Sequence, residues 1–128
     1  MNASIFAFEP RRVEKPWGYE LIWADTELYV GKLLVVCAGH ALSLQYHEHK
    51  DESWLVQDGR ALLELGTVGD PDSAHTVEIA GGDAFRYRPG TIHRIAALDD
   101  TTILEVSTPH LSDVVRLEDR YGRPERYG

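Results

Sequence analysis

Four side chains that can bind a metal ion, Gln45, His47, His49 and Glu52, lie within one segment of eight residues. In an extended strand successive side chains point to opposite faces, so Gln45, His47 and His49 are predicted to share one face. Imidazole nitrogens combined with carboxylate or amide oxygens suit divalent zinc, iron, nickel or manganese. The spacing therefore predicts a metal site, although a solvent-facing hairpin edge can carry the same residue types without function.

A later histidine, His93, lies where it could complete the coordination of such an ion. It follows a tight turn at Pro89-Gly90, which directs the next strand. Taken alone, a histidine in this setting is more often structural than a ligand. Combined with the earlier segment, it becomes a candidate metal ligand.

The elements that must position these residues are predicted to be strands. Short segments rich in β-branched and aromatic residues recur between turn signals, without sustained helical periodicity. Strands are expected at residues 19–24, 29–37, 42–49, 53–57, 60–65, 75–79, 84–88, 92–97 and 101–107. Many short strands at this spacing predict an all-β sandwich, barrel or double-sheet jelly roll.

Two connections carry specific signals. Asp58-Gly59 stands between two apolar runs and predicts a β-hairpin. Near the C-terminus, Ser112 is predicted to cap a short helical turn that ends before Tyr121-Gly122.

The whole chain of 128 residues fits one domain with its own core. Thirteen Lys and Arg against 21 Asp and Glu give a formal net charge of -8, which argues against a general nucleic-acid or anionic-membrane surface. Cys37 is the single cysteine, and we expect it to be a small buried apolar residue. No apolar run approaches the length of a membrane span, so we expect a soluble cytoplasmic protein.

The segment around Gln45 resembles the first motif of the cupin family, whose two motifs supply the metal ligands of a double-stranded β-helix. The motif fits when Gln45 takes the place of the first histidine. Gly39, His47, Glu52 and Gly59 then all fall at the spacings of the family.

A second register of the same motif would make His47 and His49 the ligand pair. It fits less well, because the leading glycine becomes Ala41 and the glutamate positions become Ser53 and Trp54. The resemblance therefore implies that the metal ligands are Gln45, His47, Glu52 and His93. His49 is then a reserve ligand or a supporting residue.

The second cupin motif is matched at Gly82, Gly90 and His93. It departs from the family at two positions, where Arg88 replaces the usual proline and Ala97 the usual asparagine. The fold implied is an all-β cupin jelly roll with a short C-terminal helical turn.

A narrower resemblance, to the C-terminal cupin domain of type II (bifunctional) phosphomannose isomerases, spans residues 15–123. It is carried by segments 15–18, 42–47, 50–54, 90–94 and 113–123. The resemblance implies one cupin domain over residues 1–128, with an edge strand at about 1–10, a barrel at about 15–108 and a tail at 109–128. The nucleotidyltransferase domain that usually precedes this cupin has no counterpart in the sequence, so guanylyl transfer is not expected.

The same resemblance implies a metal-dependent isomerase that interconverts mannose 6-phosphate and fructose 6-phosphate. Zinc is the expected ion, with nickel, manganese or iron as alternatives. Arg94 and then Lys50 are the candidate catalytic cations near the substrate oxygens. Arg86 and Arg88 could hold a phosphate if their strand faces inward, and are otherwise solvated.

Two other functions remain open: a non-catalytic sugar-binding or regulatory module, and a metal-dependent dioxygenase, which glutamine in the first ligand position disfavours. The expected partner is a small sugar or sugar phosphate, without nucleic acid or membrane. We also expect a homodimer, because Leu42, Leu44 and Tyr46 form an apolar face that needs cover. Residues 1–8 are a candidate exchanged edge strand.

Overall fold

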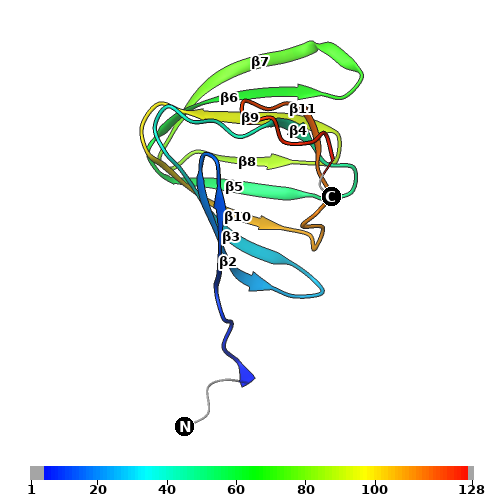
Figure 1. The fold of residues 1–128 in the computed structure, drawn as a ribbon. Coiled ribbons are helices and arrows are strands. Elements are labelled where there is room, and N and C mark those ends of the chain that lie inside the picture. Colours follow the sequence, from blue (N-terminus) through cyan, green and yellow to red (C-terminus); the bar gives the residue numbers. More distant parts are fainter. Residues whose placement is uncertain (1–4, 127–128) are drawn as a thin grey trace.

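The computed structural model describes residues 5–126, and their strands form two antiparallel sheets that face one another (Figure 1). The six-stranded sheet has the order β1 (Arg11–Lys15), β2 (Gly18–Asp25), β3 (Val30–Val36), β10 (Thr101–Ser107), β5 (Glu52–Asp58) and β8 (Ala84–Tyr87). The five-stranded sheet has the order β11 (Val115–Glu118), β4 (Leu44–Tyr46), β9 (Thr91–Ala97), β6 (Arg60–Thr67) and β7 (Asp70–Ala80). The predicted all-β jelly-roll class is confirmed.

The core lies between the two sheets and changes character along the strands. In β3 and β10 alternate residues are buried, as expected for strands with one face on a core. Toward one end these inward residues are apolar, as with Leu34 and Ile103, and each such buried side chain contributes about 1.5–3 kcal/mol. Toward the other end they are Lys32 and Glu105, also buried. The charged half of the interior is where the site forms.

The connection at Asp58-Gly59 is a crossover and not the predicted hairpin. It joins β5 to β6, which belong to different sheets: β5 pairs with β10 and β8, and β6 with β7 and β9. Gly59 has a φ of 102°, and a Cβ there would lie 2.4 Å from the carbonyl oxygen of Asp100. The dipeptide therefore makes a tight turn between layers, which a local turn signal cannot distinguish from a hairpin.

The ligand strand is shorter than predicted, because β4 ends at Tyr46 where the prediction continued to His49. Beyond Tyr46 the chain bends, and the backbone N–H groups of Glu48, His49 and Lys50 donate to the Asp113 carboxylate. Alternation of faces therefore stops before His49. The directions of the side chains from residue 47 onward are set by this bend and cannot be read from the alternation of a strand.

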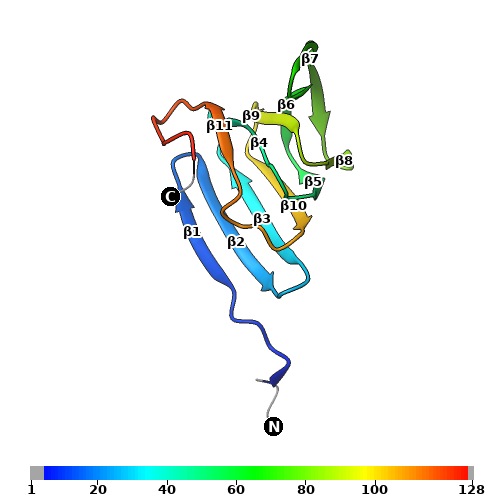
Figure 2. The same cartoon turned by 90° about the vertical axis from the view of Figure 1, so that its right-hand side faces the viewer.

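The predicted helical turn after Ser112 is wrong, since the chain forms strand β11 there. Val115 and Arg116 pair with Tyr46 and Gln45 at the edge of the five-stranded sheet (Figure 2). A free sheet edge offers backbone hydrogen bonds to a strand, and β-branched Val114 and Val115 favour the extended form. The Asp113 carboxylate accepts hydrogen bonds from the backbone of the bend at residues 48–50, which is distant in sequence, and does not cap a local helix.

At the N-terminal side, residues 5–10 form no strand, and the edge strand of the sheet is β1. The remainder of the predicted edge strand, residues 1–4, lies outside the described residues. Cys37 is exposed and not buried, because it lies just beyond the end of β3. Among the described residues no helix is long and apolar enough to cross a membrane.

Candidate metal centre

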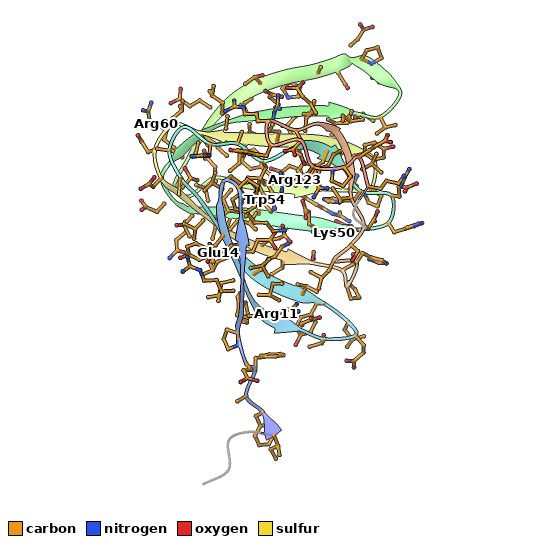
Figure 3. All side chains as sticks on the ribbon, viewed as in Figure 1. Arg11, Glu14, Lys50, Trp54, Arg60 and Arg123 are labelled. Atoms are coloured by element: carbon orange, nitrogen blue, oxygen red, sulfur yellow. The ribbon has the colours of Figure 1, made fainter. Side chains whose placement is uncertain are left out.

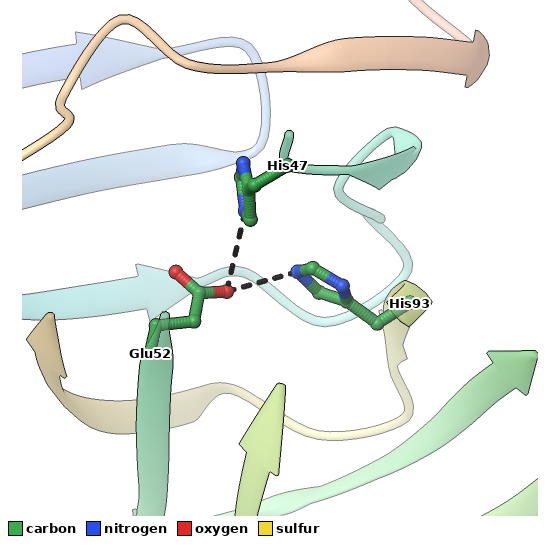
Figure 4. A group of neighbouring side chains, drawn as sticks. All are labelled: His47, Glu52 and His93. Carbon is green, nitrogen blue, oxygen red and sulfur yellow. Dashed lines mark ion pairs between the residues drawn. The ribbon is translucent and has the colours of Figure 1, made fainter. Parts of the chain in front are cut away.

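Three predicted ligands, His47, Glu52 and His93, meet between the two sheets (Figure 4). The Oε1 atom of Glu52 lies 2.9 Å from Nε2 of His93 and 3.4 Å from Nε2 of His47. Glu52 begins β5 and His93 lies in β9, so each sheet supplies one of them. All three are at most 4% exposed. The fold thus brings together side chains that are separated by up to nearly fifty residues in the sequence.

Both imidazole rings are held by hydrogen bonds from their far nitrogens. Nδ1 of His93 lies 2.9 Å from the carbonyl oxygen of Thr91, and Nδ1 of His47 is hydrogen-bonded to the carbonyl oxygen of Asp113. A carbonyl only accepts, so each Nδ1 carries the proton and donates. In the neutral rings, Nε2 therefore presents a lone pair toward Glu52. This arrangement is the one that metal-binding histidines use.

The cluster has the properties expected of a cation site. The two Nε2 atoms and Oε1 of Glu52 are buried without a hydrogen-bond partner in the described part of the chain, whereas Oε2 of Glu52 faces the Lys50 ammonium. Buried lone pairs that face one another are costly unless a cation lies among them. Two imidazoles and a carboxylate fit zinc or another divalent transition ion.

Gln45 is the fourth predicted ligand, and its position suits that role. It is the direct partner of His93 across β4 and β9, and opposed residues in an antiparallel pair share a face. It also lines the same cavity as His47. Its Oε1 accepts a hydrogen bond from the Ser43 hydroxyl, which orients the amide.

His49 does not join the cluster, although the sequence predicted it on the same face. It is exposed, and its ring lies 6.2 Å from that of His110. The reason is the bend after Tyr46, where the Asp113 carboxylate accepts the His49 N–H. The structure thus favours the register that begins with Gln45.

Lys50 lies beside the cluster and is itself buried, at 4% exposure. Its ammonium is 2.7 Å from Glu52 Oε2 and 3.2 Å from Glu105 Oε2. Burial opposes the charged form, but Glu105 and Glu52 outweigh it and raise the pKa of Lys50. Burial likewise opposes ionisation of Glu52, but the positive charge of Lys50 outweighs it and holds the pKa of Glu52 well below the usual range. Both groups are therefore charged at neutral pH.

Arg94, which was predicted to act near the substrate, lies elsewhere, and Arg86 and Arg88 take the solvated position that was the alternative to holding a phosphate. Arg94 follows His93 in β9 and so points to the other face, where it pairs with Glu64 and Glu118 at 3.0 Å. Arg86 is exposed and pairs with Asp51, and Arg88 is exposed. The structure does not bring Arg94 to the cluster, and it places Arg86 and Arg88 on the surface.

Trp54 was predicted near the metal, but Tyr87 and Asp113 also contribute to the site and were not identified from the sequence. Tyr87 stacks on His93 with ring centroids 4.2 Å apart, and Trp54 meets both rings edge-on. Asp113 supplies both the carbonyl for His47 and the carboxylate for the following bend. The pairing of Tyr87 with Glu52 and the contact of Asp113 with His47 both join segments far apart in the sequence, and neither has a local signal.

A cavity of about 300 Å³ leads to the cluster, and Gln45, His47 and Lys50 are among the residues that line it. Its size is at the lower end of the range for small-molecule sites. Side chains from β1, β2 and the C-terminal segment complete the wall. The arrangement can therefore bring a small polar molecule to the cluster.

The fold and the paired motifs define a cupin. The family model described as Mannose-6-phosphate isomerase C-terminal matches residues 6–119, and the chain belongs to that family.

Curated relatives include the mannose-1-phosphate guanylyltransferase ManC of Salmonella typhimurium, 36% identical over 118 residues. The match covers 88% of this chain and 23% of ManC. The xanthan biosynthesis protein XanB of Xanthomonas campestris is 34% identical, over 88% of this chain and 24% of XanB. The chain thus spans about a quarter of the length of these relatives.

Solved structures of similar fold have lower sequence identity. CapF, a capsular polysaccharide assembling protein of Staphylococcus aureus, is 18% identical with a TM-score of 0.66, over 89% of this chain and 36% of CapF. Oxalate decarboxylase of Bacillus subtilis, which has Mn(II) centres, is 19% identical with a TM-score of 0.71, over 84% of this chain and 30% of the enzyme. These likenesses show the cupin fold.

Proposed function

We propose that this domain is a metal-dependent isomerase of a sugar phosphate, interconverting mannose 6-phosphate and fructose 6-phosphate. The observation that carries the proposal is the buried group of inward-facing lone pairs on His47, Glu52 and His93 at the end of a cavity. Membership of the family supports the sugar-phosphate substrate.

The residues present would hold a divalent ion, with zinc favoured by two imidazoles, a carboxylate and an amide. When bound, such an ion would lower the cost of negative charge on adjacent sugar oxygens during proton transfer between their carbons. Neutral Gln45 in place of an anionic ligand keeps the site more electrophilic. Manganese, nickel and iron are the alternatives to zinc.

Lys50 would act on the substrate as a charged hydrogen-bond donor and not as a base. Its ammonium lines the cavity and is kept protonated by Glu52 and Glu105. A fixed cation in a buried site stabilises negative charge on a sugar oxygen more strongly than it would in water. The neighbouring Trp54 donates from Nε1 to Glu105 at 3.0 Å and holds that carboxylate in place.

A second candidate function is binding of a sugar phosphate without turnover. This function is favoured by how little of its relatives the chain matches. The matched domain is about a quarter of the length of proteins that are named for guanylyl transfer. In such a protein the cupin could position a substrate for another domain.

The two functions are separated by a turnover assay on the zinc-loaded protein. Conversion of mannose 6-phosphate to fructose 6-phosphate, lost in His93→Ala and retained in the surface variant Arg86→Gln, would support the isomerase. Saturable binding of mannose 6-phosphate without conversion, with each of the candidate metals, would support the binding module instead.

A further inference from the structure

The cavity that leads to the cluster is lined by an excess of positive charge. Its cationic side chains outnumber its one carboxylate, Glu20, and are Arg11, Lys15, Lys32, Lys50, Arg116 and Arg123. The chain as a whole has a formal net charge of -8, so this local concentration runs against its composition. Cations gathered in a cleft raise the local concentration of anions.

The two innermost cations are already neutralised by buried carboxylates. Lys50 pairs with Glu52 and Glu105, and Lys32 lies 3.0 Å from Glu20 and 3.6 Å from Glu105. These contacts form an alternating series of charges across the inner face of the six-stranded sheet. The other four cations of the cavity lining are Arg11, Lys15, Arg116 and Arg123.

Lys15 is the least compensated of these outer cations. Its ammonium is 4.0 Å from Glu20, a carboxylate that Lys32 engages more closely. Burial lowers the pKa of Lys15, Glu20 opposes that shift, and the positive charges of Lys32, Arg123 and Arg116 add to it. A group of cations that repel one another at the wall of a cavity is stabilised by an anion placed among them.

Arg123 is held in a fixed orientation beside this group. The Asp119 carboxylate accepts hydrogen bonds from Arg123 N, Nε and Nη2 at 2.7, 3.0 and 2.9 Å. Its Nη1 has no hydrogen-bond partner among residues 5–126, and the side chain is 20% exposed. Arg123 is among the residues that line the cavity, and a guanidinium already held by Asp119 has little rotamer entropy to lose on binding.

We propose that Lys15 and Arg123 bind the phosphate group of a phosphomonoester at the exposed end of this cavity. Lys50 and Arg123 both line the cavity, and in the view of Figure 3 they are labelled near the middle of the molecule, with Arg60 at its left edge. A guanidinium donor and an ammonium point charge together suit a tetrahedral dianion. This inference rests on the proposed function: the phosphate would lie near Lys15 and Arg123, and the sugar would extend toward His47 and His93.

The test uses the zinc-loaded chain of 128 residues and calorimetric titration with inorganic phosphate, mannose 6-phosphate and mannose. Lys15→Gln is expected to weaken binding of both phosphate compounds by about tenfold or more, the loss expected for a hydrogen bond to a charged group. Arg123→Gln should behave alike. Binding of mannose and the zinc content should not change. Arg60→Gln is the matched control, an exposed arginine with two carboxylate partners.

Unchanged affinity of Lys15→Gln for inorganic phosphate and mannose 6-phosphate would overturn the proposal. Because Arg123 also stabilises its own loop, Lys15→Gln decides the question if Arg123→Gln does not fold. The wild type could bind mannose 6-phosphate without isomerising it, while Lys15→Gln still loses that binding. This result would contradict the proposed function but would support the phosphate site.

Discussion

His47 and His93 obtain their orientation from backbone carbonyls that lie outside the cluster. The carbonyls of Asp113 and Thr91 accept from the Nδ1 atoms, so the two Nε2 lone pairs converge on Glu52. The stacking of Tyr87 on His93 adds a second constraint. The ligand geometry is therefore set before any ion binds, which lowers the entropic cost of binding.

Replacing the carboxylate at the centre of the cluster tests the ligand set. Glu52→Gln keeps the shape but removes the anionic ligand, so metal affinity should fall by more than the roughly 10–100-fold typical of losing an outer supporting group. Elemental analysis after dialysis against a competing chelator measures the change.

His49→Ala is the control for this substitution, because His49 is exposed and outside the cluster. It should retain metal at the wild-type level. Loss of metal in His49→Ala but not in Glu52→Gln would restore the register that begins with His47.

Asp119 should make stability depend on pH. The Arg123 guanidinium holds the pKa of Asp119 below its usual range, against a smaller opposing effect of burial. The ionised group then contributes stability above its unfolded pKa of about 3.9, and this contribution is lost as pH falls through the lower folded value. Asp119→Asn should therefore be less stable than wild type at neutral pH, with a gap that closes on acidification.

Urea unfolding at a series of pH values from neutral to acid measures that gap. A constant difference between Asp119→Asn and wild type across the series would show that the ionised carboxylate is not what stabilises the loop.

At the scale of elements, strand β9 separates two residues that are adjacent in sequence. His93 points into the cluster, and Arg94 points to the opposite face, toward Glu64 and Glu118. The period of two in a strand makes this separation unavoidable. The cations that line the cavity come instead from a bend, as Lys50 does, or from another strand, as Lys15 does.

The crossover between β5 and β6 gives a prediction about backbone geometry. Gly59→Ala should destabilise the fold by about 1–3 kcal/mol more than Gly82→Ala does. Both glycines have similar positive φ values, 102° and 99°. Only at Gly59 would a Cβ meet the chain, 2.4 Å from Asp100 O and 2.6 Å from Thr101 Cα. Equal losses in thermal unfolding would show that φ alone matters.

At the scale of the whole molecule, the interior is divided between stability and function. Leu34, Ile103 and Ile95 pack at one end, and the cavity and charged residues take the other. Buried ion pairs contribute little net stability because desolvation offsets their attraction. The apolar end must therefore carry most of the folding free energy.

Exposed apolar side chains near the N-terminus could form the interface of the expected homodimer. Leu42 is buried in its own subunit, but Ile5, Phe6 and Phe8 are 74%, 83% and 47% exposed near the N-terminus. If these side chains are covered by a second copy, the wild type should sediment as a dimer and Phe6→Ser/Phe8→Ser as a monomer. Leu117→Ser, which replaces an exposed residue on β11, is the control. A monomeric wild type would contradict the prediction.

Alternation along strands and turn residues are local patterns, and they were enough to predict the all-β class. The metal ligands Gln45, His47 and Glu52 were implied by the resemblance of their segment to a cupin motif, while strand alternation alone wrongly placed His49 beside them. Tertiary structure alone decided how strands pair, and so it decided that Asp58-Gly59 is a crossover, that Asp113 holds the bend after Tyr46, and that Lys15 and Arg123 line the same cavity. Such contacts join segments far apart in the chain, where backbone pairing between strands sets the distances and no local pattern records them.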